Sequence, residues 1–284
     1  FSLWGVEETL TKADGMFSLC LYDRVKNFLY FAVDRFGEKP LYVTETKDAF
    51  FFASELKAIN SLQIDGLNLD LDSVVSFTRY NYIPAPKTIY KNTIKLEGGT
   101  YLCINTKTEN YFTKKTYWSL KEDIIDQRKK SNNSFEVAKK NIDKQIQKTV
   151  KKQMISDVPI GCLLSGGIDS SIITAIAAKI SNQKIRTFSM GFEDKRFDES
   201  SHAKKIATFL GTQHTEYFVS MNDAKDLIPK IVDIYDEPFS DSSQIPTLML
   251  TSCVSKSVKV ALSGDAGDEI FGGYNRYKFI EKID

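Results

Sequence analysis

The sequence predicts two parts of different fold class. The N-terminal part is α+β with antiparallel β-sheets, and the C-terminal part is α/β with a doubly wound parallel sheet. Short apolar and aromatic runs separated by turn residues fill the first part, whereas strands alternate with helix-length segments in the second. A chain of 284 residues is also too long for one small core and fits about two domains.

In the N-terminal part, four runs rich in β-branched and aromatic residues predict strands. They cover residues 16–22, 28–33, 50–53 and 100–104. Turn residues separate them at 34–37, 65–66 and 98–99. Residues 71–80 have the pattern of a short helix, with Asp70 or Asp72 near its start.

Residues 119–134 carry mixed charges and end in Ser-Asn-Asn-Ser, which is typical of a linker that leads into a helix N-cap at Ser134. Apolar residues then recur every three or four positions from Phe135 to Met154, which predicts a long amphipathic helix. We therefore divide the chain into a first domain at 1–118, a linker at 119–134 and a second domain at 135–284.

The second domain alternates strands and helices. Strands are expected at residues 158–164, 185–190, 216–219 and 258–262, and helices at 170–180, 200–210, 224–235 and 247–257. This order specifies right-handed βαβ units around a parallel sheet.

Composition excludes several classes of protein. A net charge of +1 argues against a nucleic-acid or anionic-membrane binder, and the longest apolar stretch is too short for a membrane span. The four cysteines lack CxxC spacing and there are two histidines, so we expect no zinc site and buried thiols in a reducing cytoplasm. The chain starts at Phe1 without methionine and ends inside a helical pattern, so we expect a piece of a longer protein.

The sharpest local signal is Leu-Leu-Ser-Gly-Gly-Ile-Asp-Ser-Ser at residues 163–171, where a parallel strand ends and a helix begins. Ligands bind at such strand ends. Adjacent glycines admit close backbone approach, and a helix N-terminus attracts phosphate. Asp169 would repel phosphate unless Mg²⁺ lay between them. The alternative is an ordinary strand-to-helix turn with a serine cap. The lysine of a Walker A loop is absent.

A second loop follows the last expected strand at residues 262–274 and carries Asp265, Asp268 and Glu269. Three acids at one sheet edge repel one another unless a cation or a reacting base is present. The alternative is a solvated acidic first turn of a helix. Together with Asp169, the loop makes a plausible clamp for magnesium triphosphate.

These motifs resemble a known family. Residues 165–170 resemble the pyrophosphate loop of the N-type ATP pyrophosphatases, which have a Rossmann-like fold, and with residues 262–274 they are similar to the synthetase domain of glutamine-hydrolysing asparagine synthetases. Residues 14–17, 34–42 and 53–58 resemble the class II glutamine amidotransferase domain of the same family. The motifs occur in family order across nearly the whole chain.

The resemblance implies a glutaminase that sends ammonia through an internal tunnel to a synthetase domain. The synthetase uses ATP and Mg²⁺ to adenylate a carboxylate, usually the side chain of aspartate, and releases AMP and pyrophosphate. The implied partners are small molecules, namely glutamine, ATP and aspartate or another carboxylate. The oligomeric state stays open, with a homodimer as one option.

By match to the family motifs, Asp169 and Asp268 hold the Mg²⁺, and Asp34 holds the α-amino group of glutamine. The pyrophosphate and nucleotide contacts fall on Leu163, Ser165, Gly166, Gly167, Asp169, Ser170, Ser171, Met190, Ser263 and Gly264. Two alternatives stay open. Leu163 and Met190 can be plain core residues, and Asp34 can be the cap of an Asx-turn before Gly37.

The sequence departs from the family pattern in three places. The N-terminal cysteine nucleophile is absent, because residue 1 is Phe. Asp265 stands where typical members have the glutamate thought to deprotonate ammonia, and it is one methylene shorter. Residues 236–242 replace an arginine-containing segment that helps bind aspartate. Two alternatives therefore remain: the same chemistry on a sugar acid or other carboxylate in surface-polysaccharide synthesis, and a non-catalytic nucleotide-binding relative.

Overall fold

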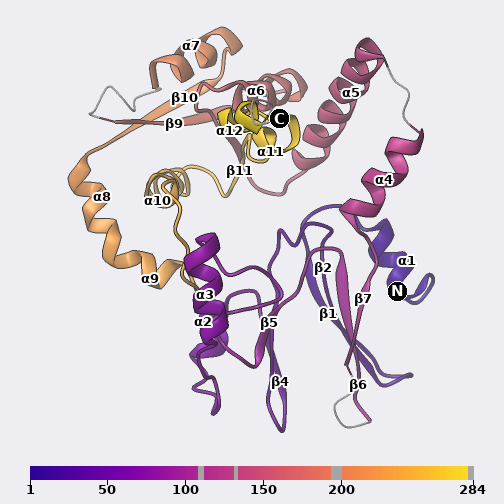
Figure 1. Ribbon diagram of the computed structural model, residues 1–284. Coiled ribbons are helices and arrows are strands. Elements are labelled where there is room, and N and C mark those ends of the chain that lie inside the picture. Colours follow the sequence, from indigo (N-terminus) through magenta and orange to yellow (C-terminus); the bar gives the residue numbers. More distant parts are fainter. Residues whose placement is uncertain (108–111, 131–133, 193–199, 281–284) are drawn as a thin grey trace. The chain divides into compact units, whose positions relative to one another are not determined.

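The computed structural model describes residues 1–107, 112–130, 134–192 and 200–280 (Figure 1). The chain forms two compact units. Unit 1 contains Phe1–Asn132 and Ile231–Asp241, and unit 2 contains Asn133–Lys230 and Ser242–Asp284. The division drawn from the sequence placed residues 231–241 in the second domain, whereas in the structure they pack with unit 1.

Unit 1 is built around two antiparallel sheets. The first has the order β1-β2-β6-β7, with strands Ser18–Asp23, Phe28–Val33, Thr100–Asn105 and Phe112–Thr116. The second has the order β4-β3-β5, with strands Phe50–Ala53, Tyr42–Glu45 and Thr93–Lys95. Buried side chains from both sheets form one core, in which Phe31 and Leu102 of the first sheet join Val43 of the second. The antiparallel sheets predicted for this part are confirmed.

Helices cover the outer faces of these sheets. α1, Gly5–Lys12, packs on the first sheet through Leu10, and α2, Leu56–Asn60, packs on the second through its buried Leu56 and Ile59. The other helices of this unit are α3 at Leu71–Tyr80, α4 at Leu120–Lys130 and α9 at Ile231–Ile234. α3 begins as predicted, because the Asp70 side chain accepts a hydrogen bond from the backbone N–H of Asp72.

Unit 2 contains a parallel sheet in the order β10-β9-β8-β11. Its strands are β8 at Ile160–Leu163, β9 at Arg186–Phe192, β10 at Gln213–Val219 and β11 at Val260–Leu262. The chain builds outward from β8 to β10 and then returns to place β11 on the other side of β8. The C-terminal ends of β8 and β11 therefore form a switch point, the usual place for a ligand in an open α/β sheet.

Helices lie on both faces of this sheet. The elements of unit 2 outside the sheet are α5 at Phe135–Gln153, α6 at Ile168–Ile180, α7 at Ser200–Leu210, α8 at Met221–Leu227, the 3-10 helix η1 at Ile228–Lys230, α10 at Gln244–Val254, α11 at Gly267–Phe271 and α12 at Asn275–Ile280. Cys162 packs with α5 and α6, and Leu164 packs with α7. Leu163 between them packs with α10 instead. Because alternate residues of a strand face opposite sides, this pattern covers the parallel sheet on two faces.

Some expectations about local structure were wrong. The helix expected at 224–235 is broken into α8, η1 and α9, because Pro229 lacks the N–H that a continuous helix needs. The segment expected to be a linker contains the helix α4. Residues 131–133 of this linker lie outside the described residues. Val150 of α5 is buried, but Phe135 at the start of its apolar stripe is 78% exposed.

The cysteines also differ from expectation. The four cysteines are free, but Cys162 is buried, Cys103 and Cys253 are half-buried and Cys20 is exposed. Cys20 lies on β1, in which alternate residues face solvent, and its thiol is on the solvent-facing side. In the described parts of the chain, no helix combines the length and apolar character needed to cross a membrane.

Candidate functional site

The first candidate loop joins β8 to α6, as the sequence predicts. Gly166 has a φ of +92°, in the region that favours glycine. A Cβ built on Gly166 would lie 2.9 Å from Cβ of His202 at the start of α7. Both the backbone conformation and the close approach of α7 therefore require glycine at this position.

Serine hydroxyls hold this loop in shape. Oγ of Ser165 and Oγ of Ser170 are 2.9 Å apart, and Oγ of Ser171 donates to the carbonyl oxygen of Gly167 at 2.5 Å. A backbone group stabilises the same arrangement, because the N–H of Ser165 donates to Oγ of Ser170 at 3.3 Å. The sequence predicts that these hydroxyls contact phosphate. The hydrogen bonds described here join them to other atoms of the same loop.

The start of α6 is suited to bind an anion. The helix has 13 residues, and its N-cap is Gly167, which has no side chain to accept from the first turn. The first N–H groups of a helix have no partner within the helix, and they lie at the positive end of its dipole. Phosphate is the usual ligand for such a loop and helix start.

The second loop meets the first. A Cβ built on Gly264 would lie 2.6 Å from the backbone nitrogen of Ser170, and one built on Gly267 would lie 2.5 Å from Cγ of Asp169. The Asp169 carboxylate therefore lies against the residue that precedes Asp268. The Asp268 carboxylate in turn lies against the backbone of Gly273. The structure thus brings together the two loops that the sequence placed at one sheet edge.

The three acids of the second loop have different partners. Glu269 accepts a hydrogen bond from the Tyr274 hydroxyl at 2.7 Å, which lowers the pKa of Glu269 and raises the pKa of Tyr274 to about 12. Asp265 is exposed and accepts from Oγ of Ser263 at 2.9 Å. Glu269 and Asp265 each accept a hydroxyl hydrogen bond from a residue of the same loop, and Asp268, which lies between them in sequence, is half-buried.

The donors fit a Mg²⁺ that arrives with a nucleotide. Asp169 and Asp268 are half-buried, and among the described residues neither pairs with a lysine or arginine. The described ranges contain no cluster of three or more His, Cys, Asp or Glu that could hold a metal. Mg²⁺ is commonly bound by one or two carboxylates together with substrate phosphates, so a full protein cage is not needed.

The two apolar candidates lie in the sheet. Leu163 is the last residue of β8, is half-buried and belongs to a core cluster with Phe188 and Val254. Met190 is also half-buried, but β9 continues to Phe192, so Met190 does not end the strand as expected. The packing of Leu163 supports its alternative role as a core residue.

Asp34 follows β2 and is 2% exposed. Its Oδ1 accepts from the backbone N–H of Phe36 and Glu38 at 3.1 and 2.9 Å. Its Oδ2 accepts from the backbone N–H of Phe17 and Lys39 at 3.1 and 2.9 Å. A carboxylate has about four lone-pair sites, so these bonds fill its capacity. The contacts support the Asx-turn alternative, and a glutamine-binding role stays a prediction.

Sequence reasoning did not identify Gly267 and Gly273, which face the two candidate metal ligands. It singled out residues 236–242 only for their lack of an arginine, and it did not indicate the distant partners of Asp236 and Glu237. Glycine beside aspartate in a loop after a strand was an available signal for the first pair. Two adjacent acids before a proline gave no comparable signal, because their partners could not be read from the sequence.

Two models of protein families match the chain. Residues 1–118 match the model of a glutamine amidotransferase domain, and residues 141–283 match the model of the asparagine synthase family. The class is therefore an amidotransferase domain joined to a synthase domain. The second match covers half of the chain, and the chain belongs to the asparagine synthase family.

Named relatives agree with this. A Methanocaldococcus jannaschii protein provisionally named asparagine synthetase (glutamine-hydrolyzing) 2 is 38% identical over 95% of this chain and 53% of its own length. Asparagine synthetase (glutamine-hydrolyzing) 1 of Bacillus subtilis strain 168 is 35% identical over 96% of this chain and 42% of its own length. The chain thus spans about half the length of these curated relatives.

Among solved structures, the NH3-dependent NAD synthetase of Campylobacter jejuni covers 48% of this chain and 60% of its own, at 11% identity and a TM-score of 0.34. That overlap is too low to support a conclusion about fold or function.

Gly267→Ala tests the close contact between the loops. Gly267 does not have a positive φ, so alanine fits the backbone, but its Cβ would meet the Asp169 carboxylate. We expect the free energy of unfolding to fall by about 1–3 kcal/mol, the usual cost of overpacking. Gly167→Ala is the matched control, because the nearest atom there is 3.4 Å away. Equal unfolding midpoints in urea for the two variants would contradict the contact.

Asp34→Asn tests the structural role of this carboxylate. The amide keeps one acceptor oxygen but turns an NH₂ group toward two backbone N–H donors. We expect a loss of about 1–3 kcal/mol in the free energy of unfolding, because buried donors lose their acceptor. In the control Asp23→Asn, a single oxygen accepts from both Val25 and Lys26, so asparagine can replace it with little change. Urea denaturation measures the free energy of unfolding of both variants. An equal loss in Asp34→Asn and Asp23→Asn would refute the structural role of the Asp34 carboxylate.

Proposed function

We propose that the protein is a cytoplasmic, glutamine-dependent amidotransferase that activates a carboxylate with ATP and converts it to an amide. One observation supports the proposal most strongly: the glycine loop before α6 and the acidic loop after β11 meet at the sheet's switch point, with Asp169 against Gly267. Family membership supports both halves of the reaction. Free cysteines are typical of a reducing compartment.

We assign the parallel-sheet unit to the N-type ATP pyrophosphatase fold, with ATP at the switch point. The loop at 165–171 and the first turn of α6 bind the β- and γ-phosphates through backbone N–H groups. Leu163, Met190, Ser263 and Gly264 contact the rest of the nucleotide. Asp169 and Asp268 hold Mg²⁺, which when bound neutralises phosphate charge.

The acceptor carboxylate attacks the α-phosphorus of ATP, and the bond to the bridging oxygen of pyrophosphate breaks. Pyrophosphate is then held by the same loop. Ammonia from glutamine attacks the activated carbonyl carbon and displaces AMP. In this proposal Asp265, which is exposed and accepts a hydrogen bond from Ser263, takes a proton from the attacking ammonia.

Aspartate is our first choice of acceptor, with asparagine as product, because the relatives carry the name asparagine synthetase. A second candidate is another carboxylate, such as a sugar acid. It is favoured by the lack of arginine in residues 236–242, where the family resemblance implies an aspartate-binding arginine.

Asp169→Asn should separate the two half-reactions of the full-length protein. Loss of one Mg²⁺ carboxylate should weaken MgATP binding and abolish pyrophosphate release, while glutamine hydrolysis continues. Wild-type protein with its acceptor should form AMP and pyrophosphate, measured by chromatography of the nucleotides. ADP as the main product would refute the pyrophosphatase assignment. Asp157→Asn, an exposed aspartate before β8, is the control and should behave as wild type.

Asp265→Asn should leave adenylation intact and slow amide formation by about 10²–10⁴-fold, because the amide cannot act as a general base. Exchange of labelled pyrophosphate into ATP reports adenylation, and amide product reports the second step. Asp265→Glu should keep most of the activity, because it restores the family's residue. Unchanged amide formation in the asparagine variant would remove Asp265 from the mechanism.

A further inference from the structure

A short stretch of chain from the synthetase half packs with the glutaminase half. We call residues 231–241 the strap. They follow η1 and precede α10, which both belong to unit 2, yet the strap itself belongs to unit 1. The chain thus enters unit 1 at Ile231 and leaves it at Asp241. Two acidic side chains carry the main contacts of the strap.

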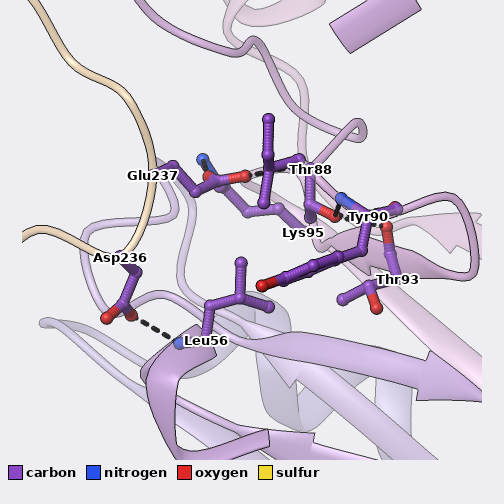
Figure 2. Close-up of polar contacts among 8 residues, drawn as sticks. Leu56, Thr88, Tyr90, Thr93, Lys95, Asp236 and Glu237 are labelled. Atoms are coloured by element: carbon purple, nitrogen blue, oxygen red, sulfur yellow. Dashed lines mark hydrogen bonds and ion pairs between the residues drawn. The ribbon is translucent and has the colours of Figure 1, made fainter. Parts of the chain in front are cut away.

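Asp236 caps α2 from a distant part of the sequence. The N–H of Leu56, the first residue of α2, donates to Oδ2 of Asp236 at 2.5 Å (Figure 2). The helix's own N-cap residue, Glu55, makes no side-chain cap hydrogen bond. Oδ1 of Asp236 lies 3.5 Å from Nζ of Lys57. An acidic side chain at a helix start satisfies a free N–H and favours the helix dipole.

Lys57 also holds the residues just before Asp236. Its Nζ donates to the carbonyl oxygens of Asp233 and Ile234 at 2.9 and 3.0 Å. These carbonyls end α9, where a cation is favourable. Two parts of α2 therefore hold the strap: the backbone N–H at the start of the helix and the side chain of Lys57.

Glu237 makes the second anchor. Its Oε1 accepts from the N–H of Ile89 at 2.7 Å. Its Oε2 lies 2.9 Å from Nζ of Lys95 on β5, and both of these side chains are labelled in Figure 2. The turn that presents Ile89 is itself fixed, because Oγ1 of the buried Thr88 lies 3.0 and 2.9 Å from the carbonyl oxygens of Tyr90 and Thr93, which share its one proton. Each carboxylate oxygen of Glu237 thus has its own partner: a backbone N–H for one oxygen and a lysine ammonium for the other.

Both carboxylates are largely withdrawn from water. The side chains of Asp236 and Glu237 are 11% and 9% exposed. Burial, together with the charges of Glu237 and Asp236, raises the pKa of Tyr42 above its usual range. Buried charges are costly and add little net stability even when paired, so their best-attested benefit is to specify one arrangement. This arrangement fixes the strap on unit 1.

The two acidic anchors of the strap bind residues of unit 1, and the partners described for them lie outside the two candidate loops of unit 2. These partners lie on α2, on β5 and in the turn at Ile89, all in unit 1. Two residues after the strap, α10 begins at Gln244, and it packs on the parallel sheet through Val254 and Leu250. Loosening the strap should therefore spare each half-reaction and disturb the passage between them.

We propose that Asp236 and Glu237 are positioning residues that couple glutamine hydrolysis to amide formation. They hold the strap on the glutaminase unit and so fix the point from which the chain continues into the synthetase unit. Both oxygens of Glu237 and Oδ2 of Asp236 are engaged there, whereas Oδ1 of Asp236 is buried without a hydrogen bond to any described residue and only faces Nζ of Lys57. This inference rests on the proposed function.

Glu237→Gln in the full-length protein tests the proposal. Glutamine can still accept from Ile89, but its NH₂ group faces the Lys95 ammonium. We expect the amide formed per glutamine hydrolysed to fall on the order of tenfold, since small displacements in a reacting assembly cost that much or more. Glutamine hydrolysis and ammonium-supported amide formation should stay within about twofold of wild type. Glu216→Gln is the matched control, because it removes a similar ion pair with Lys204, at 2.8 Å in unit 2.

Hydrogen exchange gives a readout independent of turnover. Exchange should rise in peptides that contain Ile89 and the strap, and should not rise in the control variant. An unchanged ratio of amide to glutamine hydrolysed would overturn the coupling role. A parallel loss of all activities with a lower melting temperature would show a merely structural role. A wild-type protein that forms no AMP with any carboxylate would instead overturn the proposed function, and this inference with it.

Discussion

The parallel pairing of β11 with β8 is the constraint on which the candidate site depends. Leu262 lies beside Cys162 in this register, so the loops that follow leave the sheet next to each other. Neighbouring strands lie only about 5 Å apart, so loops that leave them side by side can approach closely. At Gly264 and Gly267 the approach leaves no room for a Cβ against the backbone of Ser170 and the Asp169 carboxylate. Strand pairing thus brings the loops together, and the two glycines permit the close contact that sets Asp169 against the second loop.

The sequence was a good guide wherever structure depends on near neighbours. The Gly-Gly loop, its flanking strand and helix, and the acidic loop were all located because each is defined by a few consecutive residues. The strand β7 at Phe112–Thr116 was missed, because its residues are exposed and show no apolar alternation. The strap was assigned to the wrong neighbours for a related reason: its partners at Leu56 and Ile89 are 180 and 148 residues away. Such contacts leave no periodic signal.

The acids of this chain show how local contacts separate structural from reactive carboxylates. Asp34 accepts four backbone N–H groups, which gives this carboxylate a structural role in its own loop. Glu237 is shared between a backbone donor and a lysine. Asp169 and Asp268, by contrast, have no cationic partner among the described residues while half-buried. A half-buried carboxylate without a cation is costly unless a metal or substrate supplies the charge. The absence of a cationic partner within the described ranges thus distinguishes Asp169 and Asp268 from Glu237, and it is the property expected of carboxylates that bind a cation.

The amidotransferase motifs also acquire a second meaning. The segment 53–58 contains Leu56 and Lys57, and the segment 34–42 ends at Tyr42, whose pKa is raised by burial and by the charges of Glu237 and Asp236. These residues contact a stretch of chain that the sequence order places among synthetase elements. A motif that identifies a glutaminase domain is therefore also the surface that receives a segment of the synthetase half. Leu56 and Lys57 thus have a structural role in holding the strap that does not require either residue to contact glutamine.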